Sequence, residues 1–127
     1  MKKVYNIGVE ATLEVIGGKW KPVILCHLIH HGNIRTNEFR RLIPGISQKM
    51  LTSQLRELEQ SGLINRKVFN QVPPKVEYSL TPYGREMEPV LNLLCTWGEK
   101  HIEILIDNGD DVLLMQRDED IAVKQTS

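Results

Sequence analysis

The chain has 127 residues, of which 41% are hydrophobic and 25% charged, and its formal net charge is zero. This composition indicates one ordinary globular domain, and no stretch approaches the roughly 18 uncharged apolar residues of a membrane span. Acidic residues interrupt the apolar part of the N-terminal segment, which argues against a signal peptide, so we expect a soluble cytoplasmic protein. Cys26 and Cys95 each follow a leucine, which favours reduced, buried thiols over a disulfide framework.

The zero net charge conceals two oppositely charged halves. Residues 19–85 hold eleven Lys or Arg against four Asp or Glu, a net charge of +7. Residues 86–127 hold three basic and ten acidic side chains, a net charge of −7. A basic block attracts a polyanion and an acidic one does not, so a nucleic-acid surface is expected in the middle of the chain. The alternative interpretation is that both charged regions are ordinary solvent-exposed surfaces with no binding role.

Three short helices are predicted first. Residues 10–16 place Leu13 and Ile16 on one side of a helix that a Gly-Gly pair ends. Residues 19–31 form the second helix, in which Pro22 is tolerated because first-turn N–H groups lack partners within the helix. Thr36 is the expected N-cap of a third helix, which packs Phe39 inward before Pro-Gly breaks it.

The fourth helix has the strongest pattern. Ser47 is its expected N-cap, and Leu51, Leu55 and Leu58 recur at the spacing of one buried stripe. Ile46 and Leu51 stand at the positions of a hydrophobic staple, which fixes the angle at which the chain enters the helix. The outward face begins with short hydrogen-bonding side chains rather than with Glu and Lys.

A hairpin and a long helix follow. Residues 63–72 and 75–81 are rich in β-formers and are joined at Pro-Pro-Lys, which predicts two paired strands. Thr81 and Pro82 are the expected cap and first residue of a helix that reaches about Asp107. The predicted fold is mainly α with a small β-hairpin: a winged helix-turn-helix with N- and C-terminal dimerisation helices over residues 1–108, then an acidic, loosely ordered tail over 109–127.

In a helix-turn-helix the second helix enters the major groove and its first residues reach base edges. The opening of the fourth helix suits this role, because its side chains donate hydrogen bonds and most are short enough to let the backbone approach. Lys49 and Arg56 are the candidates for base contacts, Ser47 with the helix N-terminus suits a phosphate, and Lys75 at the wing tip suits the backbone or minor groove. The predicted DNA-binding residues are Arg35, Arg40, Ser47, Gln48, Lys49, Thr52, Ser53, Arg56 and Lys75, with Arg41 beside them. The alternative for the fourth helix is an ordinary polar surface helix. The alternative for the wing tip is an ordinary loop stiffened by prolines.

Four motifs resemble the HxlR family of bacterial transcription regulators, relatives of the MarR group. They read IGGKWKPVIL, FRRLIPGISQKMLTSQLRELEQSGLI, PPKVEYSLTPYG and WGEKH, and they extend from about Val9 to Trp97. The resemblance implies a homodimeric winged-helix protein that binds inverted repeats in promoter DNA, as a repressor or an activator. It places the recognition helix at 47–61 and the wing near 68–77.

One position departs from the family pattern. Many members that sense oxidants carry a reactive cysteine in a CPVEATL-like stretch before the first helix. This chain reads IGVEATL, so Ile7 stands where that thiol would be, and redox sensing by that route is not expected. Cys26 and Cys95 are interpreted instead as small buried hydrophobes, because a reactive thiolate needs an accessible, electropositive setting.

The last long helix carries two apolar stripes. One comprises Met87, Val90, Leu91, Leu94, Ile102 and Leu105, and the other comprises Leu93, Trp97 and Ile104. A small domain covers only one stripe easily, so Leu93, Trp97 and Ile104 are predicted to form a homodimer interface. The alternative is that the first helix of the same chain covers both.

Other functions have less support. The sequence has no Gly-rich phosphate loop and no nucleophile with an evident base, so neither an enzyme nor a catalytic residue is predicted. His27, His30 and His31 lie near Cys26, but no second ligand pair has zinc spacing, so no metal or cofactor is expected. A winged helix used only for protein contacts remains the main alternative, and a small effector of unknown identity is possible.

Overall fold

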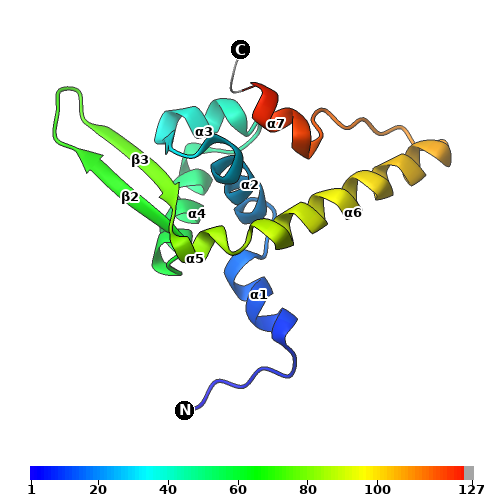
Figure 1. Ribbon diagram of the computed structural model, residues 1–127, viewed down its shortest axis with the longest axis horizontal. Helices are drawn as coiled ribbons and strands as arrows, with labels where there is room; N and C mark the ends of the chain where they lie inside the picture. The colour runs from blue at the N-terminus through cyan, green and yellow to red at the C-terminus, as the bar shows by residue number, and fades with distance from the viewer. Residues whose placement is uncertain (125–127) are drawn as a thin grey trace. The chain divides into compact units, whose positions relative to one another are not determined.

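The computed structural model describes residues 1–124. The chain forms two compact units, and the first unit ends at Arg85. The boundary predicted after residue 108 lies within the second unit, at the end of its long helix. The first unit contains α1 (Gly8–Ile16), α2 (Lys21–His31), β1 (Ile34–Arg35), α3 (Thr36–Leu42), α4 (Gln48–Gln60), β2 (Ile64–Phe69), β3 (Lys75–Leu80) and α5 (Pro82–Arg85). The second contains α6 (Glu88–Asp107) and α7 (Asp118–Lys124) (Figure 1). No helix among the described residues is both long and apolar enough to span a membrane.

The sheet has three antiparallel strands in the order β1-β3-β2. The hairpin of β2 and β3 was predicted, and its loop projects from the helices of the first unit (Figure 1). β1 was not predicted, because two residues are too short to show an alternating pattern. In the register, Tyr78 of β3 lies between Ile34 of β1 and Arg66 of β2.

Apolar side chains from α2, α3 and α4 form the core of the first unit. Leu51, Leu55 and Leu58 of α4 are each at most 1% exposed, as their spacing predicted. The Phe39 ring meets the edge of the Tyr78 ring at 6.1 Å between centroids, which joins α3 to the sheet. The core residues of this unit are Ile16, Ile24, Leu25, Leu28, Ile34, Phe39, Ile43, Ile46, Leu51, Leu55, Leu58, Leu63, Ile64, Tyr78 and Leu80. Burial of this stripe fixes which face of α4 remains outside.

Local signals set the two ends of α4. The Ser47 hydroxyl oxygen accepts a hydrogen bond from the Met50 amide at 3.0 Å, so the predicted N-cap is confirmed. Ile46 and Leu51 are both buried, as the hydrophobic staple requires. Gly45, in the turn before the helix, has φ of 90°, a backbone conformation that other residues rarely adopt.

The predicted cap of α3 is wrong by one residue. Arg35 holds the N-cap position and Thr36 is already helical. The Glu38 carboxylate accepts a hydrogen bond from the Arg35 amide at 3.0 Å, which satisfies a free N–H at the helix start without a hydroxyl cap.

The single helix predicted from Pro82 to Asp107 is also wrong, because the chain leaves the helix at 86–87 and divides it into α5 and α6. Pro89 explains the break, since a proline inside a helix lacks an N–H and clashes with the preceding turn, whereas in the first turn of α6 it is harmless. Thr81 caps α5 as predicted, accepting a hydrogen bond from the Gly84 amide at 2.9 Å.

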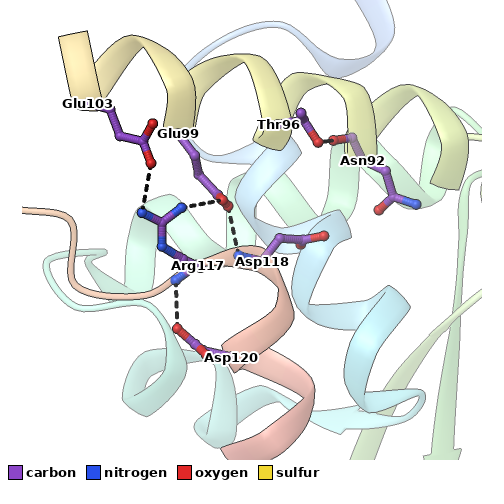
Figure 2. A network of polar contacts seen from close by, with 7 residues as sticks. All are labelled: Asn92, Thr96, Glu99, Glu103, Arg117, Asp118 and Asp120. Carbon is purple, nitrogen blue, oxygen red and sulfur yellow. Dashed lines mark hydrogen bonds and ion pairs between the residues drawn. The ribbon is translucent and has the colours of Figure 1, made fainter.

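The tail is more ordered than predicted, because residues Asp118–Lys124 form α7. Arg117 binds two carboxylates of α6, Glu99 at 3.3 Å and Glu103 at 3.1 Å, and Figure 2 shows both contacts. Glu99 also accepts a hydrogen bond from the Asp118 amide at 2.8 Å. The hydrogen bond that Arg117 donates to Glu103, together with the negative charges of Glu103 and Glu99, raises the pKa of Arg117 above its ordinary value. Residues 109–127 were predicted to be loosely ordered because they are acidic and show no strong periodicity. Arg117, the arginine of this segment, nevertheless binds it to α6.

Candidate nucleic-acid interface

The outward face of α4 is polar and accessible along its length. Six predicted DNA-binding residues on it are exposed: Ser47, Gln48, Lys49, Thr52, Ser53 and Arg56. Some already form hydrogen bonds within the helix, since the Gln48 amide donates to the Thr52 hydroxyl at 3.2 Å. The Ser47 oxygen accepts from a backbone N–H, which leaves the hydroxyl hydrogen available to an outside acceptor such as a phosphate oxygen.

Three of the predicted residues meet at one cavity. Arg35 comes from β1, Gln48 from the first turn of α4 and Lys75 from the start of β3. The cavity has a volume of about 440 Å³, and its other lining residues are Thr36, Asn37, Gln71, Pro73, Pro74 and Val76. It therefore lies between the N-terminus of the predicted recognition helix and the tip of the hairpin. Two cations and an amide beside a helix N-terminus form a setting that attracts an anion.

A second cavity, of about 300 Å³, lies between α4 and the sheet. Thr52 and Arg56 of α4 line it together with Glu59, Arg66 and Tyr78. Arg66 was not among the predicted site residues. It counted toward the basic charge of the chain, but only the pairing of β2 with β3, which sets Arg66 opposite Tyr78, shows that it belongs beside Arg56.

The wing carries paired cations on an aromatic ring. The ammonium groups of Lys67 and Lys75 lie 4.8 Å and 4.4 Å from the centroid of the Phe69 ring. Lys75 also forms an ion pair with Glu77 at 2.9 Å, so its charge is partly compensated before any ligand arrives. Lys67 is exposed, and sequence reasoning missed it.

The remaining predicted residues are exposed but lie apart from these cavities. Arg40 and Arg41 occupy the last turn of α3, Ser47 is the N-cap of α4, and Lys49 and Ser53 lie on α4. None of these five lines either cavity. The candidate interface thus comprises the two cavities, each lined by cationic side chains, and the exposed polar face of α4.

Glu57 of α4 is held by a partner outside the helix. Its carboxylate lies 2.8 Å from the ammonium of Lys21, the first residue of α2. This hydrogen bond lowers the pKa of the Glu57 carboxyl below its ordinary value. Its second oxygen accepts a hydrogen bond from the Ser53 hydroxyl at 3.4 Å.

In the second unit, α6 exposes the residues predicted to form the dimer interface. Leu93 is 71%, Trp97 68% and Ile104 49% exposed. The Trp97 ring stacks on the His101 ring with 5.2 Å between centroids, which extends this surface along one side of the helix. In the first unit, α1 exposes Leu13, which the sequence pattern placed on the same side as Ile16, and buries only Ile16.

The thiols do not match their predicted setting fully, and one histidine of α2, His27, is buried. Cys26 and Cys95 are each half-buried rather than enclosed in a core. The rings of His27 and His31 stack with 5.7 Å between centroids, and burial lowers the pKa of His27 to about 4, with a further contribution from the other two histidines of α2. Among the described residues, no cluster of three potential ligand atoms includes these histidines.

Comparison with known proteins identifies the family. The model of the HxlR-like helix-turn-helix family matches residues 15–105. The uncharacterised HTH-type transcriptional regulator YtcD of Bacillus subtilis is 69% identical over 112 residues, which cover 88% of each chain. The uncharacterised HTH-type regulator YdeP of the same organism is 61% identical over 93 residues, 73% of this chain and 72% of that one.

Solved structures agree with this comparison. A crystal structure under the name ytcD is 66% identical, covers 75% of this chain and 96% of its own, and has a TM-score of 0.71. The redox regulator HypR in its reduced form is 55% identical, covers 78% and 97%, and has a TM-score of 0.73. The predicted winged-helix fold is confirmed, and the reported relatives are named as regulators rather than enzymes. The chain belongs to the HxlR-like helix-turn-helix family and is a transcriptional regulator.

Proposed function

We propose that the protein binds specific double-stranded DNA as a homodimer, with α4 in the major groove and the β2–β3 wing on the backbone or in the minor groove. The observation that carries this proposal is the cavity shared by Arg35, Gln48 and Lys75. It brings two cations, Arg35 of β1 and Lys75 of β3, to the N-terminus of the helix that a helix-turn-helix inserts into DNA. Such a regulator acts on the chromosome, hence in the cytoplasm.

The side chains divide between two tasks. Phosphate contacts fix the register, and Arg35, Ser47 and Lys75 suit them because they surround the start of α4. Base contacts give specificity, and Lys49 and Arg56 suit these because they are long, cationic and exposed on the outward face. Gln48, Thr52, Ser53 and Arg40 supply further polar contacts along the same face.

Homodimerisation gives this DNA contact its geometry. The exposed apolar side chains of α6, Leu93, Trp97 and Ile104, would be covered by the same surface of a second copy. Exposed Leu13 makes α1 a second candidate for this interface. Two-fold pairing sets two recognition helices on half-sites about 34 Å apart, so the operator is expected to be an inverted repeat.

The salt dependence of binding tests the proposal. DNA recovered by the protein from genomic fragments, labelled with a fluorophore, is titrated with protein while anisotropy is recorded across salt concentrations. Several phosphate contacts predict that affinity falls by about 10³-fold or more between about 50 and 200 mM salt. A protein that recovers no DNA, or binds it independently of salt, contradicts the proposal. Salt-independent binding to another protein would support the alternative, a winged helix used for protein contacts.

Single substitutions test the assigned roles. Arg56→Ala is expected to relax the preference between operator variants, at a cost of about 1–3 kcal/mol for the preferred base. Lys75→Ala is expected to weaken all duplexes alike and to reduce the salt slope by about one. Lys2→Ala, an exposed cation of the N-terminal segment before α1, is the matched control and is expected to change neither quantity. Equal, small effects from Arg56→Ala and Lys75→Ala would mean that the wrong face is assigned.

We infer that redox sensing does not proceed through the position before α1. HypR is described as a redox regulator. In this chain, the N-cap of α1 is Ile7, which is 62% exposed and carries no thiol. Any thiol-based redox sensing by this protein therefore acts through other residues.

A further inference from the structure

A buried cation lies behind the recognition helix. Lys21 is only 7% exposed, and its ammonium contacts the Glu57 carboxylate at 2.8 Å across the space between α2 and α4. The neighbouring Trp20 ring reaches the turn before α4, because a Cβ added at Gly45 would lie 4.0 Å from that ring. The start of α2 therefore supports both the turn before α4 and the middle of the helix.

The position of Lys21 is unfavourable for folding by itself. Burial removes water from the ammonium, and the first residue of a helix lies at the positive end of the helix dipole. Because the Glu57 side chain is half exposed, water screens its attraction to the ammonium, so the pair offsets little of this cost. The contact is therefore better explained by what it does to Glu57 than by what it adds to stability.

Glu57 is an acidic side chain on a surface that must approach phosphates. It lies one turn beyond Ser53, and its side chain is half exposed. An uncompensated carboxylate at this place would repel the DNA backbone. Lys21 supplies the opposite charge from the protein interior and so uses none of the cations on the outward face.

We propose that Lys21 is a positioning residue for DNA recognition: its buried ammonium draws the Glu57 carboxylate toward α2 and cancels its charge, so that the outward face of α4 attracts DNA. This inference rests on the proposed function. It also assigns a role to Ser53, whose hydroxyl donates to the restrained carboxylate and thereby turns its lone pairs toward an outside donor. The hydrogen bond from Lys21 lowers the pKa of the Glu57 carboxyl, which favours its charged form in this contact.

Three variants of the full chain test the inference: Lys21→Gln, Glu57→Gln and the double substitution. Their affinities for a fluorescein-labelled random-sequence duplex of about 30 base pairs are measured by anisotropy across salt concentrations, and thermal melts give the folded fraction. Lys21→Gln uncovers a negative charge, so binding at low salt is expected to weaken about fivefold. The double substitution restores the charge balance and is expected to bind within about twofold of the unchanged protein. Glu57→Gln is expected to bind about fivefold more tightly, because it leaves the ammonium uncompensated.

The pattern separates charge compensation from a purely structural role. A structural role would lower the melting temperature in Lys21→Gln without rescue of DNA affinity by the second substitution. The inference would be overturned if Lys21→Gln bound DNA as tightly as the unchanged protein, or if the double variant bound DNA as weakly as Lys21→Gln. The proposed function would stand in both cases. If Lys21→Gln does not fold, the double substitution is compared with Glu57→Gln: an affinity about fivefold lower in the double variant supports the inference, and equal affinity overturns it. An unchanged protein that binds no duplex would overturn the proposed function, and this inference with it.

Discussion

Helices α4 and α6 are both amphipathic, but the structure treats their apolar sides differently. In α4, Leu51, Leu55 and Leu58 are at most 1% exposed, and the polar side faces outward. In α6, Leu93 and Trp97 are about 70% exposed. Helix α4 thus buries its apolar side within its own unit, whereas α6 leaves large apolar side chains accessible.

The difference shows where each helix can act on other molecules. The accessible side of α4 consists of hydrogen-bonding and cationic groups within the basic half of the sequence, which suits a polyanion. The accessible side of α6 is apolar within the acidic half, which suits another apolar surface and repels DNA. We therefore expect substitutions on α6 to alter assembly and substitutions on the outer side of α4 to alter DNA binding.

The largest effect is expected at Trp97. Replacing it with aspartate puts a charge at the centre of the exposed apolar surface of α6, so the dissociation constant of the dimer is expected to rise about a thousandfold, or about 4 kcal/mol. Sedimentation equilibrium measures this change. Asn92→Asp introduces the same group at an exposed position of α6 outside the stripe of Leu93, Trp97 and Ile104, and is the matched control. Equal dimerisation of both variants would remove α6 from the interface.

A smaller effect is expected inside α4. Leu55→Ala leaves a cavity in the core of the first unit and is expected to lower the free energy of unfolding by about 3 kcal/mol, measured by urea denaturation. Ser53→Ala, on the exposed side of the same helix, is expected to change it by less than about 0.5 kcal/mol. Similar losses from both would contradict the division of α4 into a buried and a free side.

Burial in the first unit also predicts a pH dependence, through His27. Its pKa in the folded protein is about 4, against 6.5 for an ordinary histidine, because burial disfavours the charged ring. The unfolded chain therefore binds a proton at higher pH than the folded one, and stability is lost as pH falls from about 6.5 to 4, by about 2–3 kcal/mol. Urea unfolding at several pH values measures this loss. His27→Leu is expected to remove this part of it, and an unchanged pH profile in that variant would refute the assignment.

The smallest effect is expected at the cap of α4. Ser47→Ala removes the hydrogen-bond acceptor of the Met50 amide and is expected to lower the free energy of unfolding by about 1 kcal/mol. Ser61→Ala, at the other end of the helix, removes no side-chain cap and is expected to have less than half of that effect, about 0.5 kcal/mol or below. The reverse order would show that the start of α4 is fixed by the Ile46–Leu51 staple alone.

The sequence by itself determined the features that arise from neighbouring residues. Ser47 marks the start of α4, Ile46 and Leu51 form the hydrophobic staple at that end, and Thr81 caps α5. These signals depend on backbone geometry within a few residues, so they can be recognised without knowledge of the fold. Together with four ordered motifs they were sufficient to identify the family and its winged-helix fold.

Only the tertiary structure decided which distant residues meet. β1 exists because β3 provides a partner for its two residues, and Arg66 joins Arg56 through the register of the sheet. The contact of Lys21 with Glu57 spans 36 positions in the sequence, and no local pattern predicts it. The physical reason is that these contacts form only when the core closes and fixes the elements against one another, whereas caps, turns and periodicity act along the chain itself.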